Sequence, residues 1–337
     1  MFKIKKEISS IFHIPKYWQN SLRIDSLVNF SPMISFFLEL LRPSSICEIG
    51  ANRCENTIFL MESTEDVGTS IDVVDLKISR ECRGIESCSR INFFEMPSLQ
   101  YLKIKNSSEL YIIDGDHNYQ TVSSELQIIA QNNECKCIIL HDTGWPAAYR
   151  NFYYDRCQLV VEEELDSNNL LSPFENNIGR GVLFTSHFSS HEGGERNGVR
   201  CAVENFLETS IRTWVVWTIP SILGLTILID SSLLSKDQMR CLDIFTQYKK
   251  IWDEFLSGLE INRLMLLQAL HDAGAEWDNN QAYIKEQNAR LQKAHDALQR
   301  AGAEWDKNQA YIKEQNARLQ KAHDALLRAG IIDSGAD

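Results

Sequence analysis

Short apolar runs alternate with amphipathic stretches through the first 230 residues. The runs predict buried strands at 45–50, 70–74, 90–94, 111–113 and 137–141. Between the last two, Val122, Leu126 and Ile129 recur at spacings of four and three, which is typical of a helix. Because strand-like and helical stretches alternate, the pattern predicts an α/β fold with a doubly wound, mostly parallel sheet.

Two further helices are predicted inside this region. The first covers 32–41, with Ser31 as its N-cap, Pro32 at its first position and Pro43 beyond its end. The second covers about 199–207. Helices of this kind would cover the faces of the sheet.

Residues 213–229 carry no charge for seventeen positions and must be considered as a membrane span. A spanning helix needs about twenty apolar residues. Pro220 and Gly224 interrupt the run, and both halves are rich in Val, Ile, Thr and Trp, which suit strands. We therefore expect two buried strands joined by a turn, and no transmembrane span.

The C-terminal part of the chain is a repeat. Residues 301–328 copy 273–300 with two differences, Asn279/Lys307 and Gln299/Leu327. Large apolar residues recur there every seven positions, which predicts a coiled coil; they are Leu270, Trp277, Ile284, Leu291, Leu298, Trp305, Ile312, Leu319 and Leu326. The second seam (Ala273, Asn280, Gln287, Ala294) is more polar, so a single solvated helix stays open as the alternative.

Charge and cysteine usage limit the class of protein. The net charge of −12 and pI near 5.2 argue against a nucleic-acid partner, which would need a basic surface. The nine cysteines are odd in number and irregular in spacing, with no Cys-x-x-Cys pair. We therefore expect free thiols in a reducing, cytoplasmic compartment. No secretory signal is visible at the start of the sequence.

Acidic and histidine residues follow two of the predicted strands. Asp114, Asp116 and His117 come after 111–113, while His141 and Asp142 close the strand at 137–141. In open parallel sheets ligands bind beyond the carboxyl ends of the strands, so these side chains should share one site.

A second group of residues follows the first two strands. Gly50 permits a tight turn and close approach of a ligand, but the further glycines of a dinucleotide fingerprint are missing, so NAD is not expected. An adenosine cofactor with an amino-acid tail is easier to bind. Glu48 can meet its ammonium group and Asp75 its ribose hydroxyls, although either acid can equally be structural.

These motifs together resemble class I S-adenosylmethionine-dependent methyltransferases, and more narrowly the "family 24" domain related to macrocin O-methyltransferase and cephalosporin hydroxylase. The resemblance covers about residues 30–230. It rests on Glu48-Ile-Gly, Asp75, Ile113-Asp-Gly-Asp-His-Asn-Tyr, Leu140-His-Asp-Thr-Gly-Trp-Pro, Arg150-Asn-Phe-Tyr-Tyr-Asp, Glu192-Gly-Gly-Glu-Arg-Asn-Gly-Val and Ala202-Val-Glu-Asn-Phe-Leu. It implies a Rossmann-like methyltransferase fold.

The resemblance also implies roles for single residues. The cofactor-binding residues would be Glu48, Gly50, Ala51, Asp75 and Asp114. In metal-dependent relatives the matching positions bind a divalent ion, here Mg²⁺ held by Asp114, His141 and Asp142. The catalytic residues would be Asp114 and His117, the latter as the proton acceptor.

A sugar or glycoside acceptor is likewise implied by the resemblance. Aromatic, basic and amide residues on nearby loops suit it, since rings stack on sugar faces and arginine clamps anions; they are Trp145, Arg150, Tyr153, Arg196 and Asn197. The alternative is a catalytically silent scaffold that assembles partners through its coiled coil. Cys54 favours that alternative, because the family usually has glycine there.

The expected organisation thus has five parts. The sequence predicts an N-terminal helical extension (1–30), a methyltransferase domain (31–235), a helical linker (236–263), a coiled coil (264–330) and a tail (331–337). We expect the coiled coil to make a homo-oligomer or to bind another coiled-coil partner.

Overall fold

The computed structural model describes residues 26–154, 170–171, 182–183, 187–247 and 249–328. Most of the expected N-terminal extension and the whole of the tail lie outside these residues. The chain divides into two compact units, Met1–His271 and Asp272–Asp337.

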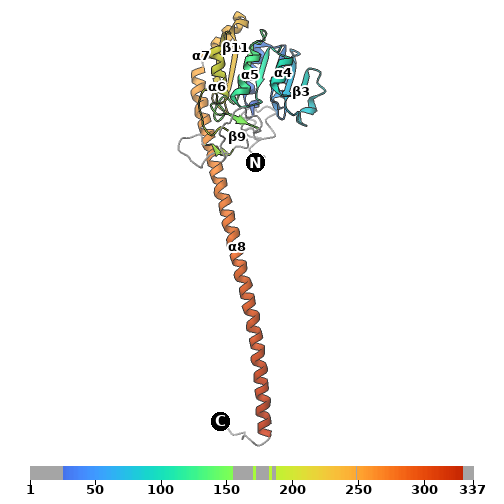
Figure 1. The fold of residues 1–337 in the computed structure, drawn as a ribbon, viewed down its shortest axis with the longest axis vertical. Helices are drawn as coiled ribbons and strands as arrows, with labels where there is room; N and C mark the ends of the chain where they lie inside the picture. Colours follow the sequence, from blue (N-terminus) through green and yellow to red (C-terminus); the bar gives the residue numbers. More distant parts are fainter. Residues whose placement is uncertain (1–25, 155–169, 172–181, 184–186, 248, 329–337) are drawn as a thin grey trace, which may run out of the picture. The chain divides into compact units, whose positions relative to one another are not determined.

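A seven-stranded sheet is the centre of the first unit (Figure 1). Its order is β10-β11-β5-β4-β1-β2-β3. The strand β11 runs antiparallel to both of its neighbours, β10 and β5, and all the other neighbouring pairs are parallel. The sequence-based prediction of a mostly parallel sheet is confirmed. The strands are β1 (Ser45–Ile49), β2 (Ser70–Asp75), β3 (Ile91–Glu95), β4 (Leu110–Ile113), β5 (Cys137–His141), β10 (Trp214–Ile219) and β11 (Leu225–Asp230).

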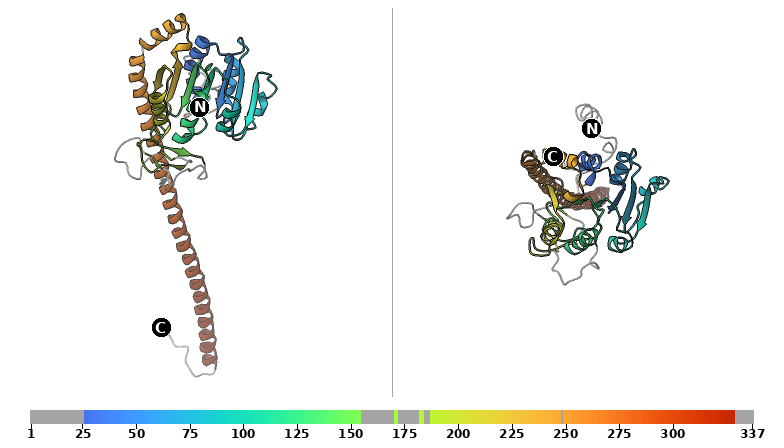
Figure 2. Two further views of the ribbon diagram at one scale, coloured as in Figure 1. Left: turned by 45° about the horizontal axis from the view of Figure 1, so that its top comes forward. Right: turned by 90° about the horizontal axis from the view of Figure 1, so that it is seen from above.

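Helices cover both faces of this sheet (Figure 2). On one face the core contains residues of α2 (Ser31–Leu41), α3 (Glu55–Ser63) and α7 (Lys236–Gln247). On the other it contains residues of α4 (Ser98–Ile104), α5 (Tyr119–Ile129) and α6 (Val199–Thr209). The apolar stripe of Val122, Leu126 and Ile129 is fully buried there, as its periodicity predicts.

Shorter elements complete the described part of the chain. Three 3₁₀ turns are η2 (Leu27–Phe30), η3 (Cys82–Ile85) and η5 (Ser231–Leu233). Four two-residue strands form two small antiparallel pairs, and they are β6 (Phe152–Tyr153), β7 (Leu170–Leu171), β8 (Val182–Leu183) and β9 (His187–Phe188).

One helix-start prediction is wrong. Ser31 is the first residue of α2 rather than its N-cap, and Phe30 occupies the cap position without a side-chain hydrogen bond. The turn η2 leads directly into α2, so the chain is already helical where a serine cap would have to be extended.

The prediction of nine free thiols is also wrong. Cys54 and Cys82 form a disulfide, with their Cα atoms 5.2 Å apart. Cys54 lies between β1 and α3, and Cys82 begins η3 after β2. Folding brings together two cysteines that are 28 positions apart, which their irregular spacing does not reveal.

The helix α8 (Lys249–Arg328) contains the repeats. Its seam residues are exposed in the single chain, with Leu291 at 68% and Leu298 at 72% of full exposure. The long C-terminal helix is confirmed. Its assembly into a coiled coil stays a prediction. Within the described residues, no helix is both long and apolar enough to cross a membrane.

Candidate active site

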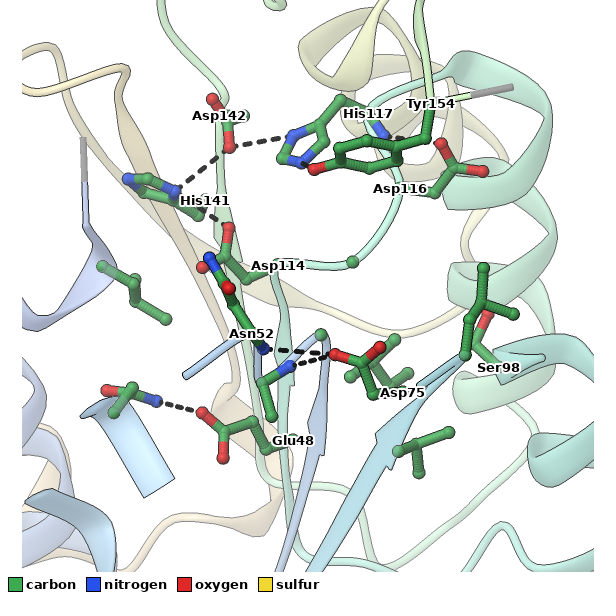
Figure 3. A pocket seen from close by; sticks show the side chains of 18 of the residues that line it. Glu48, Asn52, Asp75, Ser98, Asp114, Asp116, His117, His141, Asp142 and Tyr154 are labelled. Atoms are coloured by element: carbon green, nitrogen blue, oxygen red, sulfur yellow. Dashed lines mark hydrogen bonds and ion pairs between the residues drawn. The ribbon is translucent and has the colours of Figure 1, made fainter. Parts of the chain in front are cut away.

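A cavity of about 1700 Å³ lies at the carboxyl ends of the parallel strands. The predicted convergence of strand-end residues is confirmed, because side chains from four strand ends line this one cavity (Figure 3). They are Glu48, Asp75, Asp114, Asp116, His117, His141 and Asp142.

Gly50 allows β1 and β4 to end side by side. It has a φ of +85°, and a Cβ atom there would lie 2.3 Å from the carbonyl oxygen of Asp114. Only glycine tolerates both the left-handed backbone and this approach. The backbone that follows β4 thus lies close to Gly50, and the close approach of a ligand there stays a prediction.

Asp75 organises the loop that follows β1. Its Oδ2 accepts hydrogen bonds from the backbone N–H groups of Ala51 (2.9 Å) and Asn52 (3.1 Å). Its Oδ1 accepts one from Lys77 N (3.1 Å). Since each carboxylate oxygen has two lone pairs, Oδ1 retains the capacity to accept one more bond from a ligand in the cavity.

Glu48 is buried beneath the cavity and accepts hydrogen bonds from Asn56 Nδ2 (2.8 Å) and Thr57 Oγ1 (2.5 Å). Burial raises the pKa of Glu48 to about 7, although the two hydrogen bonds lower it in part. The Oδ1 atom of Asn56 is buried and accepts no hydrogen bond from the described residues. These oxygens together form an acceptor pair suited to a cationic group.

His141 bridges the acids after β4 and β5, and His117 contacts the second of them (Figure 3). His141 Nδ1 lies 2.9 Å from Asp114 Oδ1 and 3.1 Å from Asp142 Oδ2. His117 Nδ1 lies 2.8 Å from the same Oδ2 of Asp142, and its Nε2 lies 2.8 Å from the Tyr154 hydroxyl. A single carboxylate oxygen of Asp142 therefore contacts and orients both imidazole rings.

Burial and charge act against each other on these histidines. Burial lowers the pKa of His141, but Asp114 and Asp142 outweigh it and raise that pKa well above its ordinary value. The pKa of His117 is raised in the same way, chiefly by Asp142. Burial raises the pKa of Asp142, but His117 and His141 lower it by more than burial raises it. The carboxyl group of Asp142 is therefore ionised.

A divalent ion has one plausible set of ligands in the described residues. One ligand atom each from Asp114, His117 and Asp142 lies within 4.8 Å of the others. His141 was expected from the sequence as the third ligand, but its Nε2 bonds to the carbonyl oxygen of Ile222 (3.2 Å) and its Nδ1 faces the two carboxylates. His141 is thus placed to orient the acids.

Of the five residues expected to meet the acceptor, Trp145 and Tyr153 line the cavity. The others are absent from its lining. Arg150 is buried and donates to the carbonyl oxygen of Ser189 (2.6 Å). Asn197 is buried and accepts from the backbone N–H of Asn151 (2.6 Å), and Arg196 is exposed. Arg150 and Asn197 hold loops together beside the site.

Several residues that line the cavity were not identified from the sequence, among them Asn56, Ser98 and Tyr154. Asn56 lies at the start of a helix, just after the loop that follows β1, and this position in the sequence could have indicated that it belongs to the site. Tyr154 comes 37 positions after His117 and reaches it only through the fold, so nothing in the local sequence indicates it.

No protein-family model matches the chain, and no curated protein does. Among solved structures, the chain is similar to the SAH-bound methyltransferase PaMTH1 of Podospora anserina, at 15% identity and a TM-score of 0.41, over 68% of this chain and 94% of that one. It is also similar to the 1,6-didemethyltoxoflavin-N1-methyltransferase of Burkholderia thailandensis, at 13% identity and a TM-score of 0.38, over 67% and 85%.

A third similar structure is human N-acetylserotonin methyltransferase, at 13% identity and a TM-score of 0.34, covering 60% of this chain and 52% of that one. Similarity this low says nothing about the activity of the chain. Its sheet order and flanking helices are those of a Rossmann-like fold, and the geometry of the cavity is the evidence for function.

Proposed function

We propose that the protein is an S-adenosylmethionine-dependent O-methyltransferase. The observation that supports this most is the placement of Glu48, Asp75 and the His117–Asp142 pair around one cavity. An acceptor for an ammonium group, an acceptor for ribose hydroxyls and a base for an acceptor hydroxyl are the three protein functions that such a transfer needs.

The residues beneath the cavity are suited to the amino-acid tail of the cofactor. Glu48 would accept a hydrogen bond from its ammonium group, and so would Oδ1 of Asn56, which has no partner among the described residues. Asp75 would use the remaining capacity of Oδ1 for a ribose hydroxyl, while its Oδ2 holds the loop of Ala51 and Asn52 in place. S-adenosylmethionine, when bound, supplies an electrophilic methyl group.

His117 is the proposed general base. With Nδ1–H donated to Asp142, the neutral ring presents the lone pair of Nε2 to a hydroxyl, which in this structure is that of Tyr154. An acceptor hydroxyl in the same place would donate its proton to Nε2 as its oxygen attacks. Asp142 would stabilise the imidazolium that forms. The transfer itself needs mainly alignment of the two reactants.

A divalent cation such as Mg²⁺ is a second proposed component. Asp114 and Asp142 would supply the hard oxygen ligands it prefers, with His117 as the nitrogen ligand. When bound, such an ion would lower the pKa of an acceptor hydroxyl. His117 cannot bind the ion through Nδ1 and also donate a proton from that nitrogen to Asp142. Methyl transfer that depends on added metal would favour the role of ligand, and transfer without metal would favour the role of general base.

The proposed acceptor is a hydroxyl of a sugar or glycoside, as the resemblance to the family implies. Trp145 and Tyr153 line the cavity and offer ring faces for stacking. The silent-scaffold alternative loses its main support, because Cys54 is fully buried, bonded to Cys82 and absent from the cavity lining.

Calorimetric titration with S-adenosylmethionine tests the proposal. We expect micromolar-range binding, and no heat at millimolar cofactor would contradict the proposed function. His117→Ala should then lower methyl transfer by about 10²–10⁴-fold, the usual contribution of a general base. Its cofactor affinity should stay within a few-fold. Equal loss of affinity and turnover would instead make His117 structural.

A further inference from the structure

The turn between β10 and β11 has an unusual backbone. Ile222, Leu223 and Gly224 follow one another with φ values of +52°, +65° and +83°. A β-branched residue in the left-handed region is strained, and such conformations persist only where surrounding contacts impose them. The turn therefore needs an external support.

The support comes from α8. The buried carboxylate of Glu260 accepts a hydrogen bond from the backbone N–H of Ile222 at 2.8 Å. Arg263 donates to both oxygens of the same carboxylate, at 2.8 and 2.6 Å. The charge of Glu260 is thereby balanced, and its side chain is held in the orientation that meets the turn.

The other side of the turn is held by the loop after β5. The carbonyl oxygen of Leu223 accepts from Gly144 N at 2.6 Å. A Cβ atom on Gly224 would lie 2.2 Å from that nitrogen, so the two backbones pass at a distance that only glycine permits. The turn is thus held by α8 on one side and by the residues that follow β5 on the other.

This turn also orients His141, a histidine of the site. The carbonyl oxygen of Ile222 accepts a hydrogen bond from Nε2 of His141 at 3.2 Å. With Nε2 held by this carbonyl, Nδ1 points at Asp114 and Asp142 (Figure 3). The N–H of Ile222 is held by Glu260 and its carbonyl by His141, so both bonds depend on the same strained residue.

We infer that Glu260 is a positioning residue for the active site, which acts through the Ile222 backbone on His141 and so on the carboxylates of Asp114 and Asp142. The inference deepens the proposed function and rests on it for its catalytic consequence. It makes the N-terminal part of α8 a component of the site, since Arg263 and Leu267 of this helix line the cavity.

The test compares Glu260→Ala with Glu260→Gln in the full chain. Glutamine keeps an oxygen that can accept from Ile222 N, whereas alanine removes the acceptor. We expect Glu260→Ala to lower kcat about 10–100-fold, as loss of an outer partner of an active-site group usually does. Cofactor affinity should stay within a few-fold, and Glu260→Gln should recover most of the activity. Glu254→Ala, an exposed acid on the same helix, is the control.

A spectroscopic arm is independent of turnover. In protein labelled with ¹⁵N at histidine, the Nε2–H resonance of His141, assigned by its loss in His141→Gln, should be present in the wild type and in Glu260→Gln but lost in Glu260→Ala. An unchanged resonance and unchanged kcat in Glu260→Ala would overturn the inference. Should that variant not fold, Glu260→Asp, which is too short to reach Ile222, must show the same loss.

The two proposals fail in different ways. If the wild type binds no cofactor, the proposed function is wrong, while the His141 resonance still reports whether Glu260 supports the turn. If the wild type transfers methyl groups but Glu260→Ala does so equally well, the positioning role alone is wrong.

Discussion

His117 and His141 show how neighbours decide the role of one residue type. Both lie next to Asp142, within 2.8 and 3.1 Å. His141 has 1% of its side chain exposed and has both nitrogens engaged by protein groups, whereas His117 presents Nε2 to a hydroxyl in the cavity. The first is suited to orientation and the second to proton transfer.

A buried carboxyl group outside this network has a different consequence. Glu125 lies on α5 with no exposed surface, and burial raises its pKa from 4.5 to about 8. Because the folded pKa lies above the unfolded one, Glu125 costs nothing below about pH 4.5. Its ionisation makes folding less favourable as pH rises from there through about 8.

We predict that Glu125→Gln stabilises the protein at neutral pH. Between the ordinary pKa of 4.5 and pH 7 the cost of Glu125 grows by about 1.4 kcal/mol for each pH unit, or about 3 kcal/mol in all. Glutamine has a similar shape and no charge, so this cost is absent. Urea unfolding at pH 5 and pH 8 should show a gain that increases with pH; a gain equal at both would exclude ionisation as its cause.

At the scale of the element, two loops beside the cavity are tied together. The disulfide of Cys54 and Cys82 links the loop after β1 to η3 after β2, and neighbours of both cysteines, among them Asn52 and Ser79, line the cavity. The loop after β1 thus meets three constraints at once: the disulfide, the Asp75 hydrogen bonds and the close approach of Gly50 to the backbone of Asp114.

The glycines inside α8 differ from Gly50 in having free space. A Cβ atom on Gly274 or Gly302 would meet nothing within 4 Å. Glycine in a helix interior costs about 1 kcal/mol relative to alanine. We predict that Gly274→Ala and Gly302→Ala each stabilise the helix by about this amount, seen as a higher midpoint in thermal melts followed by circular dichroism.

The reverse change, Ala275→Gly, should lower the midpoint and serves as the control. If the alanine variants were less stable than the wild type, the glycines would be positions where a second helix approaches closely. That outcome would point to a packed interface at Gly274 and Gly302.

At the scale of the whole molecule, the boundary between the two units matters for experiments. Glu260, Arg263 and Leu267 contribute to the first unit, and the second begins at Asp272. A deletion that removes the repeats without damaging the site should therefore start at 272.

We predict that deletion of 272–337 lowers the oligomeric state and spares cofactor binding. The exposed apolar seam of the repeats, for example Leu291 and Leu298, is the expected contact. Light scattering should report a smaller mass per particle, with an unchanged dissociation constant for S-adenosylmethionine. A mass equal to that of one chain in both proteins would show that the repeats do not self-associate.

The fold was predictable because its signals are local. Apolar runs and the 3.6-residue stripe of α5 reported the elements, and their alternation reported a parallel sheet. The strand-end acids Asp75, Asp114 and Asp142 could be assigned to one site because parallel strands end at the same edge. Residues such as Tyr154 and Glu260 could not, because they reach the site from distant segments.

The sequence by itself thus determined the elements, the mostly parallel direction of the strands and the edge at which the acids gather, since each depends on periodicity or on chain direction. Only the tertiary structure decided which groups touch. It joined Cys54 to Cys82, moved Arg150 and Asn197 into loop-holding roles, and gave His141 a carbonyl partner in the turn of Ile222. Hydrogen bonds and disulfides form between groups that lie a few ångströms apart in space, and the spacing of residues along the chain does not indicate which groups will lie that close.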